Sequence, residues 1–186
     1  MKHLGTKIIE TERLILRPFT RSDAPAMYRN WASDPEVTKY LTWPTHSSLD
    51  VSAWVVNDWV NHYGEDSYYQ WAVVLKELDE PIGSIAVVKI DDQAQWVEIG
   101  YCIGKNWWHR GYTSEALQAL IRFFFLEVGA GRVCARHDPR NANSGAVMRN
   151  CGLMYEGTLR RADHNNQGIC DTAVYGILRE EYDADQ

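Results

Sequence analysis

The chain has 186 residues, of which 45% are hydrophobic, and its formal net charge is −6. This length suits one domain over residues 1–186, with a core that needs neither a metal nor disulfides. The acidic balance and the lack of a basic run argue against a nucleic-acid partner, because phosphate binding needs a basic face. No apolar run approaches the ~20 residues of a membrane span, so we expect no membrane partner.

The four cysteines are widely and irregularly spaced. They are Cys102, Cys134, Cys151 and Cys170. Without a Cys-x-x-Cys pair, the spacing argues against structural zinc and against a disulfide framework. The N-terminus also lacks a signal-peptide pattern. We therefore expect a cytoplasmic protein that binds no metal.

The apolar pattern predicts strands and helices along the whole chain. Capping-box spacing of Thr20 and Asp23 begins the first helix, and Gly64 ends the second. Residues 40–46 and 161–168 are expected to be loops. The expected elements are, in chain order, a strand over 13–17, helices over 20–32 and about 49–63, strands over 69–75, 82–88 and 96–103, a helix from Gly111 to about 126, a strand over 132–136, a short helix over 143–151, and strands over about 153–159 and 171–179.

This order predicts an α+β domain with one central mixed sheet flanked by helices. Short turns join antiparallel neighbours, whereas the helix after Gly111 supplies the crossover that parallel neighbours require. Most of the sheet is therefore expected to be antiparallel.

Residues 109–116 lie between a strand and a helix, and they predict an anion site. The first N–H groups of a helix lack intrahelical partners, and the helix dipole adds positive potential. Gly111 lets a phosphate approach the main chain closely, and His109 and Arg110 add donors beside it. We therefore expect a ligand that carries a phosphate or pyrophosphate.

A second polar segment leads into the short helix, with Asn141 and Ser144 at the mouth of a core strand, where such sheets usually bind ligands. Together with the glycine turn, it resembles the GNAT acyl-CoA N-acyltransferases, and more narrowly their RimJ/RimL-like branch, which acetylates ribosomal-protein N-termini. The motifs that carry this resemblance are Glu10-Thr11-Glu12-Arg13-Leu14-Ile15-Leu16-Arg17, Glu98-Ile99-Gly100-Tyr101, residues 109–116, Asn141-x-x-Ser144, and Val147-Met148-x-x-Cys151-Gly152-Leu153-x-x-Glu156-Gly157.

The resemblance implies a GNAT fold and acetyl-CoA as cosubstrate, with its pyrophosphate on the backbone N–H groups of residues 109–114. Trp108 stands where the family usually has Gln or Arg, and Thr113 where it has Gly or Ala. Backbone contacts should survive both changes. The residues implied to bind the cosubstrate are Cys102, Ile103, His109, Arg110, Gly111, Tyr112, Thr113, Ser114, Asn141, Ser144 and Arg149.

GNAT chemistry is a direct attack of an amine on a thioester, which needs a base for the amine and a proton for the thiolate. Glu98 is the candidate base; alternatively, it only binds the substrate ammonium or supports the structure. Ser144 matches the position of the general acid, with helix N-capping as the alternative. Asn141 matches a contact to the pantetheine arm, with an Asx-turn as the alternative. Arg149 either reaches the 3′-phosphate of CoA or lies on a solvated face.

The sequence does not identify the acceptor amine. Trp43, His46 and Trp71 are candidate acceptor contacts. The resemblance implies acetylation of a primary amine, first a protein N-terminal α-amine and second a small antibiotic or metabolite amine, by a monomer or homodimer. A non-catalytic CoA-binding module is the rival from another class, and the retention of Glu98, Asn141 and Ser144 favours catalysis.

Overall fold

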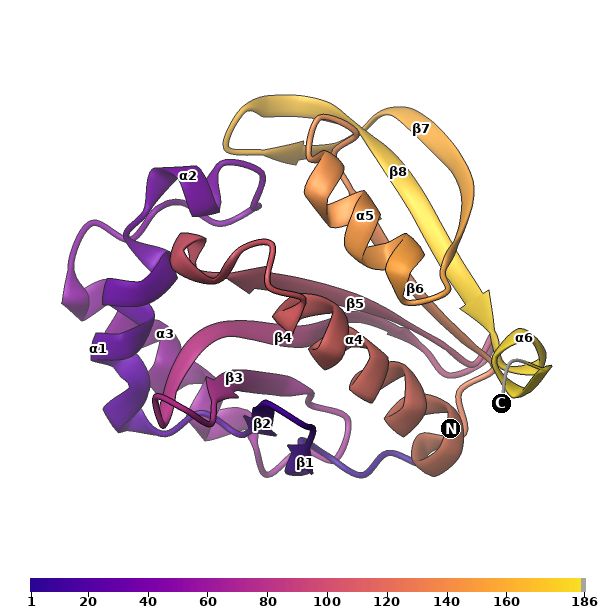
Figure 1. Cartoon of the computed structure of the whole chain (residues 1–186), viewed down its shortest axis with the longest axis horizontal. Coiled ribbons are helices and arrows are strands. Elements are labelled where there is room, and N and C mark those ends of the chain that lie inside the picture. The colour runs from indigo at the N-terminus through magenta and orange to yellow at the C-terminus, as the bar shows by residue number, and fades with distance from the viewer. Residues whose placement is uncertain (185–186) are drawn as a thin grey trace.

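An eight-stranded sheet in the order β1-β2-β3-β4-β5-β6-β8-β7 organises the chain (Figure 1). The computed structural model describes residues 1–184. The strands are β1 (Ile9–Glu10), β2 (Leu14–Arg17), β3 (Gln70–Leu75), β4 (Glu80–Asp91), β5 (Trp96–Ile103), β6 (Arg132–His137), β7 (Met154–Asn165) and β8 (Gly168–Leu178). Only β5 and β6 pair in parallel. The mixed, mostly antiparallel sheet that the sequence predicts is thus confirmed.

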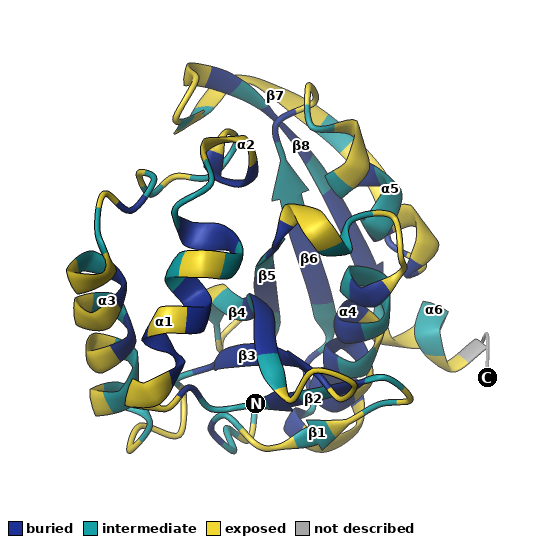
Figure 2. Cartoon of the chain, turned by 60° about the vertical axis from the view of Figure 1, so that its left-hand side comes forward, coloured by how far each residue is buried: buried dark blue, intermediate teal, exposed yellow. Residues whose placement is uncertain are grey.

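Helices cover both faces of this sheet (Figure 2). They are α1 (Ala24–Met27), extended by a π turn over Tyr28–Ala32, α2 (Pro35–Thr38), α3 (Leu49–His62), α4 (Tyr112–Phe123), extended by a π turn over Phe124–Val128, α5 (Ala142–Asn150) and α6 (Arg179–Ala184), with 3-10 turns over Arg21–Asp23 and Lys105–Trp107. The predicted capping box of Thr20 and Asp23 is present. Within residues 1–184, no helix is both long and apolar enough to span a membrane.

Each face of the sheet has its own core. Leu117, Leu120 and Ile121 of α4 are buried together with Trp71 of β3. On the opposite face, Met27 of α1 and Trp31 of the π turn that extends it pack with Val56 of α3. Alternating side chains of the central strands therefore meet different helices, and one strand can present residues to two separate compartments.

Several predicted boundaries were wrong. The strand predicted over 82–88 is longer, because β4 spans Glu80–Asp91. β7 and β8 continue to Asn165 and Gly168, so residues 161–168 are mainly hairpin rather than loop. Backbone pairing holds this hairpin together. Much of β7 is exposed and polar, so its sequence shows little of the apolar alternation that predicts a strand. α5 begins at Ala142 rather than Asn143. The short elements β1, α2 and α6 lie outside the predicted set because two to six residues carry too little periodicity.

A fork in the sheet positions the site. The parallel pairing of β5 and β6 joins Trp96, Val97 and Glu98 to Arg132, Val133 and Cys134, and stops there. Beyond Glu98, β5 runs on to Ile103 and β6 to His137 without pairing to each other. Side chains and backbone beyond the fork are therefore available to ligands.

Candidate active site

The predicted anion turn has the backbone geometry that phosphate binding requires. Gly111 is the N-cap of α4, with φ of 79°, and His109 has φ of 58°. Glu115 N–H donates to the Gly111 carbonyl, but within residues 1–184 the N–H groups of residues 109–114 donate to no backbone carbonyl. Free N–H groups at the positive end of a helix dipole, around a glycine, fit an anion.

Residues near the start of β2 brace this turn from outside. Glu115 accepts hydrogen bonds from the Thr11 hydroxyl over 2.6 Å and from the Arg13 backbone and Nε over 2.8 and 2.7 Å. The Arg13 guanidinium also donates to the Arg110 carbonyl and lies 4.4 Å from the ring centroid of Tyr112. Thr11, Arg13 and Glu115 appear in the resembling motifs, but sequence reasoning alone gave them no role.

The turn opens into a cavity of about 700 Å³. Most of the predicted cosubstrate residues line it: Cys102, Ile103, His109, Gly111, Tyr112, Thr113, Ser114, Asn141 and Ser144. Its other end reaches α2 and the loop after it, with Lys39 and Tyr40 on the wall. An anion cradle at one end of a long cavity fits a nucleotide diphosphate that carries an extended arm.

Ser144 and Tyr101 form a hydrogen-bonded pair on the wall of this cavity. The Tyr101 hydroxyl donates to the Ser144 carbonyl over 3.0 Å and lies 3.1 Å from Ser144 Oγ. Burial raises the pKa of Tyr101, although the hydrogen bond to Ser144 opposes that shift, so the phenol stays protonated at neutral pH. Two hydroxyl groups therefore share a proton-donating position.

The structure excludes two alternatives from the sequence. Asn141, not Ser144, is the N-cap of α5, so helix capping does not explain the Ser144 hydroxyl. The Asn141 side chain makes no cap hydrogen bond, and no Asx-turn hydrogen bond of this side chain is found within residues 1–184. Both polar groups face the cavity instead.

A second cavity, of about 450 Å³, lies on the other side of the fork. Ser84 and Ala86 of β4 contribute small side chains to its wall, Gly100 of β5 contributes backbone, and Glu98 lines this cavity but not the first. The residues common to both cavities are Tyr40, Leu41, Tyr101, Cys102, Asn141 and Ser144. The two compartments thus meet beside Tyr101 and Ser144.

Glu98 is 4% exposed and ion-paired at the mouth of the fork. Arg136 Nη2 on β6 donates to Glu98 Oε2 over 2.5 Å. Within residues 1–184, Oε1 of the same carboxylate has no hydrogen-bond partner. The pair orients a buried negative charge toward the second cavity while one oxygen remains available to a ligand.

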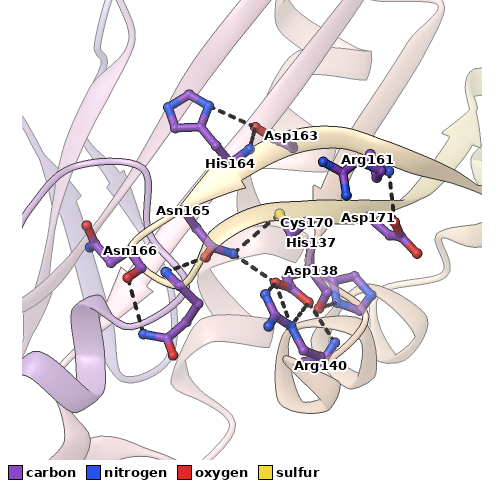
Figure 3. Close-up of polar contacts among 11 residues, drawn as sticks. His137, Asp138, Arg140, Arg161, Asp163, His164, Asn165, Asn166, Cys170 and Asp171 are labelled. Carbon is purple, nitrogen blue, oxygen red and sulfur yellow. Dashed lines mark hydrogen bonds and ion pairs between the residues drawn. The ribbon is translucent and has the colours of Figure 1, made fainter.

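The tip of the β7–β8 hairpin closes one side of the second cavity. Figure 3 shows Asn165 reaching from the hairpin to Asp138, with Nδ2 2.8 Å from Oδ2. Asn166 Nδ2 donates to the carbonyls of Thr38 and Trp43, each over 2.8 Å. We call these contacts of Asn166 the hairpin bridge. Hydrogen bonds from Arg140 hold the pKa of Asp138 below its usual range, against the effect of burial, so the anchor of Asn165 stays charged at neutral pH.

Four predicted site residues lie elsewhere. Trp71 is fully buried in the core on the α4 side, and its indole N–H donates to the Lys7 carbonyl. His46 is 6% exposed and hydrogen-bonded to Ser52. Neither lines either cavity, whereas Trp43 lines the second.

The two arginines also differ from expectation. Arg149 Nη1 donates to the Tyr175 hydroxyl over 3.0 Å. Among the described residues, neither Arg149 nor Arg110 lines either cavity. Tyr101, Arg136 and Gln70, which sequence reasoning did not select, do line the site. Tyr101 was visible in the motif Glu98-Ile99-Gly100-Tyr101, but strand alternation alone does not reveal a partner on α5.

The chain matches the family model described as Acetyltransferase (GNAT) domain over residues 13–154. It is 31% identical over 172 residues to an uncharacterized N-acetyltransferase of Bacillus licheniformis, covering 92% of this chain and 96% of that protein. It is 29% identical over 140 residues to the ribosomal-protein-serine acetyltransferase of Escherichia coli (strain K12), covering 74% of this chain and 76% of that protein.

Among solved structures, an acetyltransferase of the GNAT family from Bacillus anthracis matches with a TM-score of 0.83 and 28% identity, covering 94% of this chain and 100% of that one. The family match spans the phosphate turn, the fork and the wall that carries Ser144. The chain belongs to the GNAT family and is an acetyl-CoA-dependent N-acetyltransferase.

Proposed function

We propose that this enzyme acetylates a protein N-terminal α-amine, as a member of the RimJ/RimL-like branch. One observation carries the proposed reaction: the cavity with the phosphate turn and the cavity with Glu98 meet beside Tyr101 and Ser144. A thioester held at that junction faces an amine held by Glu98. The name of the Escherichia coli relative supports a protein acceptor.

On the cosubstrate side, the backbone N–H groups of residues 109–114 hold the pyrophosphate of acetyl-CoA. Thr113 does not disturb this role, because the donors belong to the main chain. Asn141 binds an amide of the pantetheine arm with its free side-chain amide. The arm then brings the thioester to the junction of the two cavities.

On the acceptor side, Glu98 Oε1 binds the substrate ammonium and takes one of its protons, directly or through a water molecule. The amine nitrogen attacks the thioester carbon and forms a C–N bond. When the C–S bond breaks, the Ser144 hydroxyl protonates the departing thiolate and Tyr101 reprotonates Ser144 through their hydrogen bond. The second proton of the nitrogen passes through water to the Tyr101 phenolate and restores the phenol, while Glu98 releases its proton to solvent.

A small amine is the second candidate acceptor, and the hairpin bridge favours it. Asn166 joins the hairpin tip to Thr38 and Trp43, so the wall above the cavity is continuous there. A continuous wall suits a compact molecule better than an extended chain that must leave the site.

A thiol-release assay with acetyl-CoA tests both candidates. The panel contains short peptides with free N-termini, the same peptides with blocked N-termini, and small primary amines. We expect turnover that requires a free amine, with peptides ahead of small amines. If kcat/KM is greater for small amines than for peptides, the proposal of a protein acceptor is wrong and a small amine takes its place. Saturable CoA binding without turnover on any amine would contradict catalysis and support a binding module.

A further inference from the structure

Gln70 presents a buried side-chain amide that has no protein partner. The residue is 8% exposed at the start of β3, and its Nε2 is fully buried without a hydrogen-bond partner in the described chain. Its backbone N–H donates a hydrogen bond to Thr6 Oγ1 over 3.0 Å, and its backbone carbonyl accepts one from the Tyr63 hydroxyl over 2.7 Å. The strand position is therefore rigid while the side chain is unsatisfied.

This amide lies on the wall of the acceptor cavity. Gln70 pairs across the sheet with Ala86, which pairs with Gly100, so the three residues form one row on the face that also carries Glu98. Ala86 and Gly100 line the same cavity, and the Val88 side chain packs over Gly100. Glu98 lies two strands away from Gln70, a lateral distance of about 10 Å between backbones.

A buried amide normally finds a hydrogen-bond partner, because leaving it unpaired costs its full desolvation. Trp31 Nε1 is also buried and unpaired, but Trp31 lines neither cavity and packs in the core below α1. Gln70, Arg136 and His137 each have a buried side-chain nitrogen without a partner within residues 1–184, and all three line the second cavity. Gln70 alone of the three is not ionisable, and it lies on β3, across the cavity from the ion pair of Glu98 and Arg136.

We infer that Gln70 is a specificity-determining residue that hydrogen-bonds an oxygen atom of the acceptor while Glu98 holds the amine. This inference rests on the proposed function. The acceptor class is a primary amine that bears a carbonyl or hydroxyl oxygen several bonds from its nitrogen. A peptide N-terminus supplies such an oxygen from a backbone carbonyl, and an amino alcohol supplies it from a hydroxyl. Both offer the same chemistry to the amide.

The test measures amine binding to the enzyme saturated with CoA, which has no acetyl group to transfer. Straight-chain alkylamines are compared by calorimetry with the matched ω-hydroxyalkylamines of each length, and with amino-acid and dipeptide amides. At the fitting length, we expect the oxygen to tighten wild-type binding about five- to tenfold. Gln70→Leu should remove that gain and leave the affinity for plain alkylamines and for CoA nearly unchanged.

Two further variants sharpen the result. Trp31→Phe removes an equally buried N–H outside the cavity and should keep the wild-type preference. Gln70→Glu retains an acceptor oxygen but loses the amide donor, so it should still favour a hydroxyl and lose the gain from a carbonyl. This variant also covers the case in which Gln70→Leu does not fold.

The outcomes separate this inference from the proposed function. A preference for any oxygen that persists in Gln70→Leu, a preference for a carbonyl oxygen that persists in Gln70→Glu, or no preference at any length in the wild type overturns the role of Gln70. A preference in binding that depends on Gln70 supports it, even if a parallel thiol-release assay finds no turnover. In that last case only the proposed acetyl transfer fails.

Discussion

Arg13 and Glu115 are joined by an ion pair with Nε 2.7 Å from Oε2, although 102 positions separate them in the chain. The same guanidinium donates to the Arg110 carbonyl over 2.9 Å. One side chain at the start of β2 therefore fixes both the first turn of α4 and the residue before Gly111. The phosphate turn is held by tertiary contacts as well as by its own sequence.

Replacing Glu115 with Gln should weaken this brace. We expect Glu115→Gln to raise the Kd for CoA several-fold and to lower the free energy of unfolding at pH 7 by about 1–2 kcal/mol. Burial alone raises the pKa of Glu115, but hydrogen bonds from Thr11 and Arg13 outweigh it and hold the pKa below its usual value.

A lowered carboxyl pKa stabilises the fold above the unfolded value of ~4.3, and this stabilisation is lost as pH falls through the folded value. The stability gap between wild type and Glu115→Gln should therefore close as the pH falls below about 4. Urea denaturation at pH 7, 5 and 3.5 measures the gap. If the difference in stability between the two proteins stays constant with pH, the negative charge of Glu115 does not explain it.

The phosphate turn makes a prediction of its own. Gly111→Val should raise the Kd for CoA more than tenfold, because the left-handed backbone resists a β-branched residue and an added Cβ would lie 3.4 Å from Arg13 Nη2, which braces the turn. Gly129→Val is the matched control: φ is 80° there too, and no atom lies within 4 Å of an added Cβ. Calorimetry should find unchanged CoA affinity in the control, while unchanged affinity in Gly111→Val would refute the placement of the pyrophosphate.

Ser144 and Tyr101 should affect turnover rather than cosubstrate binding. If Ser144 protonates the thiolate, Ser144→Ala should lower kcat about 10²-fold, less than a full general-acid effect because a thiolate leaves readily. Tyr101→Phe should lower kcat by a smaller factor. Asn141→Ala should act mainly on the KM for acetyl-CoA. Steady-state kinetics separate these effects, and wild-type kcat in both hydroxyl variants would leave the pair without a chemical role.

Glu98 should act on the amine, because it lines the second cavity and not the first. Glu98→Gln keeps the shape, so CoA affinity should be nearly unchanged while kcat/KM for the amine falls. The deficit should shrink as pH rises past ~7.7–8.0, where an α-amine loses its proton without help. A pH profile of both enzymes tests this: a deficit independent of pH would exclude the base, and a loss only in CoA binding would exclude the acceptor side.

The hairpin bridge should govern access to the acceptor cavity. Asn166→Asp removes both donated hydrogen bonds and sets a carboxylate against the carbonyls of Thr38 and Trp43. We expect the KM for the amine to rise about tenfold and to change more than the KM for acetyl-CoA. Gln167→Ala alters the same hairpin tip without touching that loop and should behave as wild type. If the two variants behave alike, the bridge does not shape the acceptor site.

Local patterns in the sequence determined much of this protein. The bounds of β5, the course of α3 and the left-handed glycine that begins α4 were all predictable, because strand alternation, helical periodicity and turn chemistry depend on neighbouring residues. The face of β5 on which Glu98 lies also follows from alternation along one strand. These features need no knowledge of distant segments.

Only the tertiary structure decided which candidates share a site. Trp43 lines the second cavity while Trp71 is core, a difference that comes from the face of the sheet each meets. Contacts of Tyr101 with Ser144 and of Glu98 with Arg136 join elements far apart in the chain. They depend on the separation of β5 and β6 after Glu98. That separation is a property of strand pairing between distant segments, which alternation within one strand does not encode.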